Sequence, residues 1–412
     1  MKHKIMLACS MLFILIVTAT CSLPPTEDVP VPDEARLYVD CLTLSPGSDE
    51  TQLTVSWHSH DKTGLVFVRE DGSEAEFEVD SKSILVNEAF GYTHKATVTN
   101  LMSNTTYLYK ISNGVAVSLE YDITIGDTAR YSFFVVGDPQ IIDPDSDAQK
   151  WENTINRAVA AFPEASFMIS CGDQVDGTGD VEVQYAAYLS PLGLRSLLVA
   201  QTMGNHDVLD TAAYANHFNM PNYRAFGTIF ESVRNQGDYW FTYGSSLFMV
   251  LDSNITSIMQ HKNFMEKAID SNPDCLWKIA IFHDPIYSEG DHHDDFYQLI
   301  QRDTWTPVID SLGIDVVFSG HDHTYCRTHP MRGNKATQNG TVYFSLNSSS
   351  GSKYYDFANL MKAPYTAFRS QNYRPQFTKV DVTDYGLTIT TYEVMDDGEL
   401  NQIDSYIISK PK

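Results

Sequence analysis

The sequence is poor in basic residues. Its 412 residues hold 28 Lys and Arg against 53 Asp and Glu, a formal net charge of −25. Because a nucleic-acid backbone is gripped by a basic surface, no nucleic-acid-binding module is expected. The chain is 43% hydrophobic and 20% charged, which excludes disordered, collagen-like and coiled-coil proteins and allows a sizeable core. The length predicts two or three domains.

Long apolar runs are also missing, except for one at the N-terminus. Residues 5–19 are almost all apolar and follow Lys2, His3 and Lys4. This run is short for a membrane span, which needs about 20 residues, and fits a secretory signal. We expect residues 1–21 to be a signal peptide or lipoprotein-type leader and residues 22–34 a linker, so that the protein is secreted or attached to the cell surface. Cleavage before Cys21 would give a membrane lipid anchor there; plain export or an uncleaved anchor is the alternative.

Cysteines are few and have no framework spacing. Beyond the leader four remain, and they allow three disulfide pairings without favouring one: Cys41, Cys171, Cys275 and Cys326. Cys171 lies in an apolar strand pattern and is expected to be a packed thiol. Several histidines have no motif around them and are expected at the surface or as satisfied core residues: His58, His60, His94, His217, His261 and His329.

Two kinds of pattern divide the rest of the chain. Residues 35–128 contain short alternating runs with turn signals between them, which predict an all-β sandwich domain of about seven strands. From Tyr131 the pattern changes to strands followed by helices, which predicts an α/β domain over residues 129–410. Buried strands are expected at 131–136, 166–170, 197–202, 276–282 and 315–319, and residues 147–162 have the period of a helix.

Side chains that bind metals follow these five strands: Asp138, Asp173, Asn205, His283, His321 and His323. Loops at the ends of strands are where α/β sheets place their sites. Mixed oxygen and imidazole donors favour Zn, Mn or Fe over Ca or Mg alone. Six donors are too many for one catalytic ion and suit two ions that share a bridging ligand.

The order of these motifs resembles the calcineurin-like metallophosphoesterase superfamily: Gly137-Asp138, Gly172-Asp173-Gln174-Val175-Asp176, Gly204-Asn205-His206-Asp207, His283 and Gly320-His321-Asp322-His323. Within it the chain is most similar to purple acid phosphatases. A β domain precedes the catalytic part, the last motif continues to Arg327, and His292-His293 follow His283 by nine and ten residues. Residues 101–109 resemble a fibronectin type III module. The resemblance implies a central β-sandwich flanked by helices as the catalytic fold.

The resemblance also implies roles. Asp173 would bridge two metal ions, Asp138 and His323 would bind the first, and Asn205, His283 and His321 would bind the second. His206 would contact the phosphate and protonate the leaving oxygen, with His292 and His293 as candidate partners in catalysis. Asn205, His206 and Arg327 would bind the phosphate ester.

Two positions depart from the family pattern. Purple acid phosphatases have Tyr three residues after the bridging Asp, where this chain has Asp176, so the identity of the two metal ions stays open among Fe, Zn and Mn. Most of the superfamily has His where this chain has Gln140, which is a weak ligand or only a hydrogen-bonding group. Asp176 would compensate as a carboxylate ligand or as an orienting group.

The expected function is an exported binuclear-metal phosphatase that hydrolyses phosphate monoesters by attack of a metal-bound hydroxide. The first alternative is a phosphodiesterase, nucleotidase or pyrophosphatase at the same site, because substrate choice depends on loops such as 216–238 and 351–374. The second is a surface binding protein with a vestigial site, which Gln140 supports. The oligomeric state is not readable from the sequence.

Overall fold

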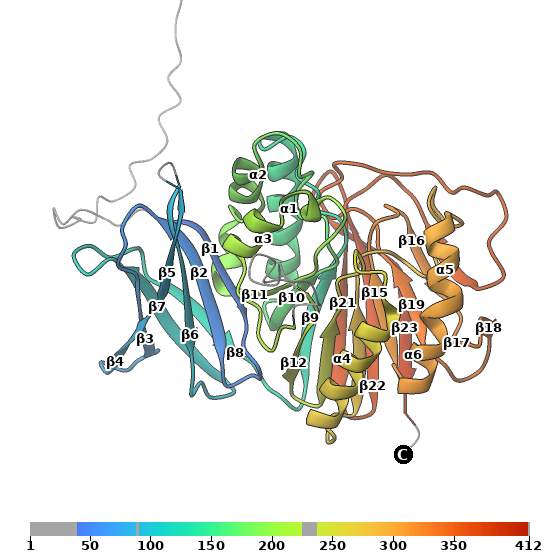
Figure 1. Ribbon diagram of the computed structural model, residues 1–412, viewed down its shortest axis with the longest axis horizontal. Helices are drawn as coiled ribbons and strands as arrows, with labels where there is room; N and C mark the ends of the chain where they lie inside the picture. Colours follow the sequence, from blue (N-terminus) through green and yellow to red (C-terminus); the bar gives the residue numbers. More distant parts are fainter. Residues whose placement is uncertain (1–38, 88–89, 225–236, 411–412) are drawn as a thin grey trace, which may run out of the picture. The chain divides into compact units, whose positions relative to one another are not determined.

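The computed structural model describes residues 39–87, 90–224 and 237–410 (Figure 1). The predicted leader, the linker and Cys21 lie outside the described residues. From Arg36 onward the chain forms one compact unit. Among the helices of the described ranges, none is both long and apolar enough for a membrane span.

The N-terminal part consists of two antiparallel four-stranded sheets. In spatial order the first contains β1 (Asp40–Pro46), β2 (Leu53–Ser59), β6 (Gly91–Val98) and β5 (Lys82–Asn87), and the second β4 (Glu76–Asp80), β3 (Leu65–Glu70), β7 (Thr105–Ser112) and β8 (Tyr121–Ile125). Val66 and Val68 are buried while their neighbours in β3 are less so, as in a sheet with one face on a core. The predicted all-β sandwich is confirmed.

The C-terminal part contains two larger sheets. The six-stranded sheet has the order β11 (Leu198–Gln201), β10 (Ala165–Ser170), β9 (Tyr131–Val136), β21 (Gln376–Thr383), β22 (Gly386–Val394) and β23 (Leu400–Ser409). The seven-stranded sheet has the order β12 (Tyr239–Tyr243), β13 (Ser246–Val250), β14 (Trp277–Ile281), β15 (Val316–Ser319), β19 (Val342–Ser345), β16 (Tyr325–Thr328) and β20 (Thr366–Ser370). A small hairpin joins β17 (Met331–Arg332) to β18 (Lys335–Ala336).

Aromatic side chains fill the space between the two large sheets. Phe133 of the six-stranded sheet meets Phe248 of the seven-stranded sheet edge-on, with ring centroids 5.2 Å apart. Phe167 meets Phe241 in the same way at 5.7 Å. Strands covered on both faces read as continuous apolar runs, which is why β9 and β10 were predictable from the sequence. The predicted central β-sandwich is therefore present.

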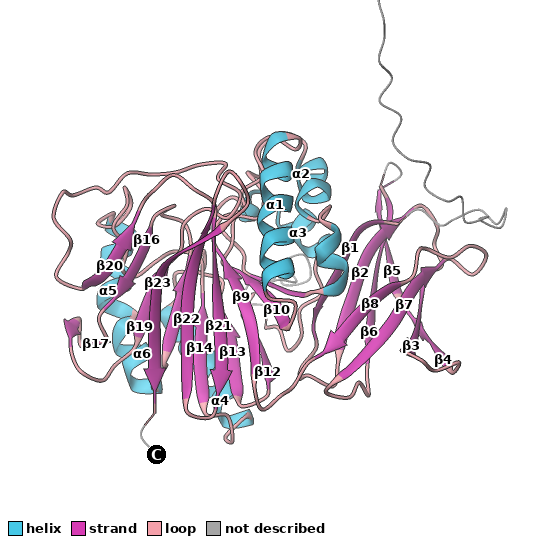
Figure 2. Ribbon diagram, turned by 180° about the vertical axis from the view of Figure 1, so that it is seen from behind, coloured by secondary structure: helices cyan, strands magenta, loops and turns pink. Residues whose placement is uncertain are grey.

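Helices cover the outer faces of the large sheets (Figures 1 and 2). Helices α1 (Ser146–Ala161), α2 (Val181–Tyr188) and α3 (Thr211–His217) lie beside β9 and β10, whereas α4 (Ile258–Ser271), α5 (Phe296–Thr304) and α6 (Thr306–Leu312) lie against the seven-stranded sheet. Helix α1 buries Trp151, Ile155 and Ala158. Successive members of this set are four and then three residues apart, so they lie on one face of the helix. The chain also forms two short 3-10 helices, η1 (Leu192–Ser196) and η2 (Asp207–Asp210).

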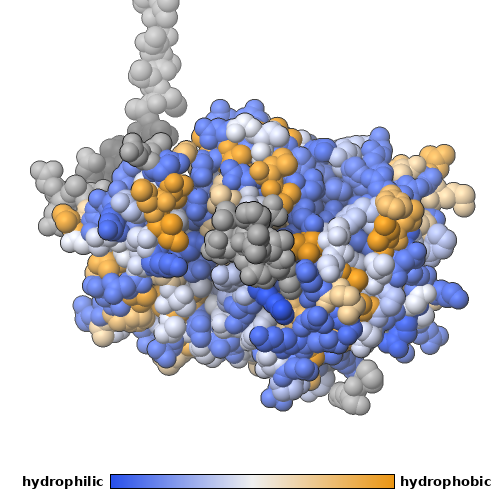
Figure 3. Space-filling model, viewed as in Figure 1, coloured by the Kyte–Doolittle hydropathy of each residue, from blue (hydrophilic) through white to orange (hydrophobic). Residues whose placement is uncertain are grey.

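Strand direction brings the loops of the two sheets together. Strands β9, β10 and β11 are parallel, and so are β13, β14, β15 and β19, so each group has its carboxyl ends at one edge. Gly137, directly after β9, pairs with Ser348, shortly after β19. The carboxyl edges of both sheets therefore meet. The face in Figure 3 is mostly hydrophilic with separate apolar patches, as expected for a chain of this charge.

Candidate metal centre

All five predicted donor loops begin where a central strand ends. Asp138 follows β9, Asp173 follows β10, Asn205 follows β11, His283 follows β14, and His321 follows β15. The backbone turns sharply at these places: φ is 42° at Asp138, 49° at Asp173 and 72° at His321. Left-handed backbone at residues other than Gly is uncommon and gathers at functional sites.

Glycines before the donors allow the loops to approach one another. A Cβ on Gly204 would lie 2.0 Å from the Asp173 carboxylate, and one on Gly320 would lie 2.6 Å from that of Asp138. Neither contact is sterically allowed, so only Gly fits before Asn205 and before His321. The Gly residues of the sequence motifs are thus explained by close packing of the donors.

Four donors converge on one point. Asn205 Oδ1 lies 2.9 Å from His283 Nε2 and 2.8 Å from His321 Nδ1, and the two nitrogens are 3.2 Å apart. Asp173 Oδ2 lies 3.3 Å from His283 Nε2. Ligand atoms around a first-row metal with bonds of about 2.1 Å are spaced by about 3 Å. These donors, predicted for the second ion, therefore fit one metal ion.

Hydrogen bonds orient the histidine rings toward this point. Nδ1 of His283 lies 2.9 Å from the Cys171 carbonyl oxygen and donates to it. Nε2 then carries no proton in the neutral ring, and its lone pair faces Asn205. His323 uses Nδ1 in the same way on the Lys353 carbonyl oxygen, at 2.9 Å, so its Nε2 is available. A ring nitrogen held by a carbonyl is the usual support of a metal-binding imidazole.

A second group of donors lies beside the first. His323 Nε2 lies 3.8 Å from Asp138 Oδ1, and the charge of Asp173 acts on the pKa of both residues. Gln140 is buried, and its Nε2 donates to Asp176 Oδ1 at 3.4 Å, whereas its Oε1 has no hydrogen-bond partner. An orphaned buried acceptor is rare, and here it is an oxygen that a cation would satisfy. The residues present therefore fit two metal ions.

Buried carboxylates at this site are stable as anions only when a positive charge lies beside them. Burial raises the pKa of Asp138 to about 8, even though His283 acts in the opposite direction. Burial also lowers the pKa of His321 to about 4 and of His323 to about 3, so both imidazoles are neutral at pH 7. Burial acts against the change, but Asp173 and Asp138 raise the pKa of His283, so this ring is where positive charge gathers among the carboxylates. A metal ion bound beside the neutral His321 and His323 would take over that charge.

His206 lies at the rim of the centre. Its main-chain nitrogen donates to Asp173 Oδ1 at 2.9 Å, and its Nδ1 lies 2.7 Å from the Asp176 carbonyl oxygen. The side chain of His206 is 25% exposed, so Nε2 is accessible to a ligand. Asp176, which was predicted as a compensating group, contacts both His206 and Gln140.

The structure distinguishes the two adjacent histidines. Nδ1 of His292 pairs with Asp295 at 2.8 Å, and its ring lies 4.8 Å from that of His321. His293 uses both nitrogens elsewhere: Nε2 accepts from Asn359 at 3.0 Å, and Nδ1 donates to the Gly290 carbonyl oxygen at 3.0 Å. Only His292 is therefore brought to the donors with a nitrogen to spare.

Arg327 is not brought to the centre, contrary to its predicted role in phosphate binding. Its guanidinium makes two hydrogen bonds to Asp404 on β23, at 2.6 and 3.1 Å, and lies 4.4 Å from the ring of Tyr406. The prediction is wrong because the Arg327 side chain, on β16, binds Asp404 on β23 and so links a strand of the seven-stranded sheet to a strand of the six-stranded sheet.

Three further residues lie around the centre, and only Asp322 stood in a sequence motif. Lys353 places Nζ 4.6 Å from the ring centroid of Tyr355, and that ring lies 5.2 Å from His323 and 5.3 Å from His292. Asp322 accepts from the main-chain nitrogen of His292 at 2.9 Å. Lys353 and Tyr355 lie in the loop between β19 and β20, and no periodic sequence pattern predicts where the side chains of such a loop lie.

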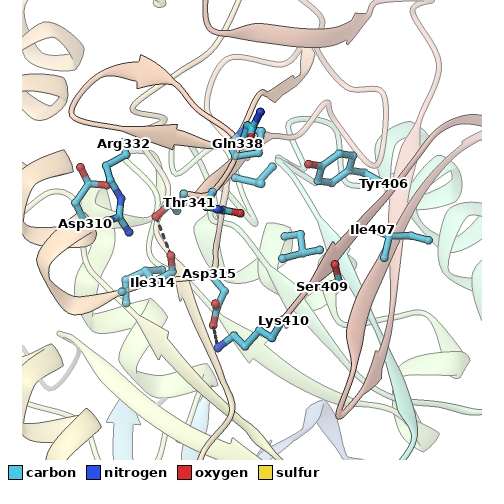
Figure 4. Close-up of a pocket in the computed structure, with 16 residues that line it drawn as sticks. Asp310, Ile314, Asp315, Arg332, Gln338, Thr341, Tyr406, Ile407, Ser409 and Lys410 are labelled. Atoms are coloured by element: carbon cyan, nitrogen blue, oxygen red, sulfur yellow. Dashed lines mark hydrogen bonds and ion pairs between the residues drawn. The ribbon is translucent and has the colours of Figure 1, made fainter. Parts of the chain in front are cut away.

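Two sizeable hollows lie away from the donors. One of about 500 Å³ is lined by Asp315, Thr341, Arg332 and Lys410, among others (Figure 4). Asp315, which pairs with Lys410 at 2.9 Å, directly precedes β15, whereas His321 follows the same strand. This hollow is therefore at the opposite end of the strand from the metal centre.

Two family patterns match the chain. The pattern described as Calcineurin-like phosphoesterase matches residues 131–325, and the one described as Purple acid Phosphatase, N-terminal domain matches residues 39–132. Among curated proteins, "Probable inactive purple acid phosphatase 1" of Arabidopsis thaliana is 22% identical over 362 residues, which cover 78% of this chain and 58% of that protein. The chain thus spans little more than half the length of this relative.

Solved structures show the same fold. A purple acid phosphatase from yellow lupin (Lupinus luteus) seeds superposes with a TM-score of 0.75 at 17% identity, over 90% of this chain and 74% of that one. The structure of PhoD gives a TM-score of 0.65 at 12% identity over 92% of both chains. The chain therefore carries a calcineurin-like phosphoesterase domain preceded by a purple acid phosphatase N-terminal domain.

Proposed function

We propose that this protein hydrolyses phosphate monoesters at the centre formed by the six donors. The observation that carries the proposal is the convergence of Asp173, His283 and His321, whose ligand atoms lie within 4.8 Å of one another. These three residues come from different loops separated by up to 148 positions, 173 to 321. Donors from such distant positions meet only because the fold brings their loops together at the carboxyl edges of the two sheets.

Each residue has a task in this proposal. Two bound cations, Fe, Zn or Mn, supply Lewis acidity that activates a water molecule and neutralises the phosphate. With its Nδ1–H held by the Asp176 carbonyl oxygen, His206 in the doubly protonated form would donate the Nε2 proton to the leaving oxygen and end as the neutral ring. Lys353, instead of Arg327, adds positive charge beside His323, and His292 contacts the ester with the ring nitrogen that Asp295 leaves free.

Hydrolysis of p-nitrophenyl phosphate by the metal-reconstituted chain tests the proposal. We expect turnover with at least one of Fe, Zn or Mn and its loss in Asp173→Asn, while Asp274→Asn, an exposed carboxylate elsewhere, keeps it. Absence of turnover on any phosphate ester with two metal ions bound would contradict it. The rates on p-nitrophenyl and bis-(p-nitrophenyl) phosphate decide between a monoesterase and a diesterase, and a panel with nucleotides and pyrophosphate covers the remaining alternatives.

A binding protein with a vestigial site is the second candidate. Gln140 stands where the superfamily carries a histidine ligand, and the Arabidopsis relative is named inactive. In this case metal analysis after chelation and reconstitution gives fewer than one ion per chain at the six donors. Two ions without turnover on the ester panel would also support this candidate.

Export is the last part of the proposal. Residues 1–21 have the composition of a leader, and we propose a secreted or surface-attached protein with a phosphate ester as its ligand. Mass spectrometry of the mature N-terminus in the native host identifies the cleavage site. Lipid on Cys21 indicates membrane attachment, and a leader that stays on a cytoplasmic protein contradicts export.

A further inference from the structure

A second group of metal-binding side chains lies outside the proposed active centre. Cys41 comes from β1, His58 from β2 and His217 from the end of α3, and one ligand atom of each lies within 4.8 Å of the others. All three side chains are buried. We propose that Cys41, His58 and His217, together with Glu182, bind one zinc ion that joins the N-terminal sandwich to helices α2 and α3. This site does not depend on the proposed function.

Both histidines present a buried ring nitrogen that makes no hydrogen bond. His217 donates from Nδ1 to the Ala213 carbonyl oxygen at 2.8 Å, and its Nε2 is buried with no hydrogen bond. His58 hydrogen-bonds the main chain of Asn216, and its Nε2 is likewise buried with no hydrogen bond. The two rings have centroids 4.4 Å apart. The expectation of satisfied core or surface histidines is wrong for this pair, since each keeps a lone pair that a cation would accept.

Glu182 supplies the fourth ligand. Its Oε2 lies 3.4 Å from His217 Nε2, and its charge also acts on the Cys41 thiol. Tetrahedral zinc with bonds of about 2.0–2.3 Å holds its ligand atoms about 3.3–3.8 Å apart, which the distance from Glu182 to His217 matches. Cys41, His58 and His217 lie within 4.8 Å of one another without Glu182, so the Glu182 side chain would turn further toward them to complete the site. A Zn²⁺ with one thiolate, one carboxylate and two neutral imidazoles forms a neutral unit, which suits a buried position.

The electrostatics of the four residues agree with this assignment. Burial lowers the pKa of His58 and, more strongly, that of His217, so both imidazoles are neutral. Burial raises the pKa of Glu182 to about 7, and Asp210 and Asp180 add to the effect. Burial, Asp40 and Glu182 disfavour the Cys41 thiolate more than Arg195 favours it, and Glu182 lies among acidic neighbours, so zinc would relieve both anions.

The backbone of β1 is distorted where it delivers the thiol. Cys41 has φ of 51°, in the left-handed region, and the β1–β2 register shifts between Asp40 and Thr43. A bulge of this kind re-aims a side chain at the cost of regular pairing. Here it directs a cysteine toward two histidines, and such strain persists where the surroundings require it.

The zinc site would fix the segment that follows the catalytic loop. Helix α3 comes after η2, which begins one residue beyond His206. Lys95 of β6 already donates to the carbonyl oxygens of Ala215 and Phe218 at the end of α3. In Figure 1, β1 and β2 lie beside α2 and α3. A metal ion here would stabilise the position of this helix against the sandwich.

Cobalt substitution in the full chain tests the proposal. After chelation and addition of Co²⁺, we expect a near-ultraviolet thiolate-to-cobalt charge-transfer band that saturates at one equivalent and is removed by Zn²⁺. The proposed active centre has only oxygen and nitrogen donors and gives no such band. Cys41→Ser should abolish the band, whereas Cys275→Ser, a half-buried free thiol elsewhere, should keep it. Asp173→Asn should also keep it, which separates this site from the proposed phosphatase.

Two outcomes overturn the proposal. One is a wild-type protein that shows no thiolate band at saturating Co²⁺, a result that needs no variant. The other is a band that persists in Cys41→Ser or is lost in Asp173→Asn. If Cys41→Ser does not fold, His217→Gln replaces it, with loss of the band and of one zinc per chain as the expected result.

Discussion

The main-chain carbonyl oxygen of Asp176 lies 2.7 Å from Nδ1 of His206. This contact fixes the tautomer of the ring, because a carbonyl accepts only from N–H, and it leaves Nε2 directed elsewhere. Asp176 occupies the position at which purple acid phosphatases have a tyrosine. Its backbone therefore positions a histidine, while its carboxylate accepts from Gln140.

Removing the His206 ring should slow catalysis without removing the metals. We expect His206→Ala to lower kcat/KM by about 10²–10⁴-fold, the usual contribution of a general acid, with metal content unchanged. Asp176→Asn should cost less, since the bond to His206 comes from the main chain. Steady-state kinetics with elemental analysis check this, and a larger loss in Asp176→Asn would show that its carboxylate binds a metal instead.

His292 and His293 should differ when each is replaced. His292 lies beside His321 with one nitrogen free, whereas both nitrogens of His293 are hydrogen-bonded, to Asn359 and to the Gly290 carbonyl oxygen. We expect His292→Ala to lower kcat/KM by at least about 10-fold, within the range for proton-transfer groups, and His293→Ala to act mainly on thermal stability. Equal kinetic losses in the two variants, at equal folding, would refute the distinction.

Gln140 should determine how tightly the first ion binds. Its orphaned Oε1 indicates a weak ligand, so Gln140→Ala should lower the affinity for one of the two ions by about 10–100-fold, as for a group that supports a metal site. Gln140→His should raise the affinity of the same ion. Competition with a chelator measures both, and an unchanged affinity in both variants would show that the residue only hydrogen-bonds.

The sequence predicted the donor loops because several constraints coincide there. A strand buried on both faces must be apolar, and the polar residue that ends it stands out, as at Val136 and Asp138. Arg327 was misplaced since its partner, Asp404, lies 77 positions further along the chain. The Cys41 cluster was missed for the same reason: His58 and His217 are 159 positions apart, and only the packing of α3 on β2 brings them together.

Arg327 should matter for stability and not for catalysis. Its guanidinium and the Asp404 carboxylate are only 11% and 8% exposed, so Arg327→Gln leaves a buried charge unpaired and should cost about 3 kcal/mol. Urea unfolding measures the loss, and Arg332→Gln, at an exposed position, is the control. The folded variant should keep its kcat/KM within about two-fold, well below the loss that removal of a catalytic group causes. A raised KM for phosphate esters at unchanged stability would restore the sequence-based role in substrate binding.

His94 should make the sandwich sensitive to acid. Its ring stacks on Trp57 with centroids 4.9 Å apart, and its nitrogens lie 2.8 Å from Ser83 Oγ and 3.0 Å from Ser59 Oγ. Burial lowers the pKa of His94 to about 4, and although a main-chain contact with Asp61 acts against this, His58 adds to it.

The unfolded chain, with a histidine pKa of about 6.5, binds more protons than the folded one between pH 4 and 6.5. The contribution of His94 to stability is therefore present above about pH 6.5 and is lost as the pH falls toward 4. Between pH 7 and 4.5, His94→Gln should lose less stability in urea unfolding than the wild type, while the exposed control His329→Gln should follow the wild type. Equal losses in all three proteins would mean that His94 takes up its proton within the folded state, which its buried contacts with two serines and Trp57 oppose.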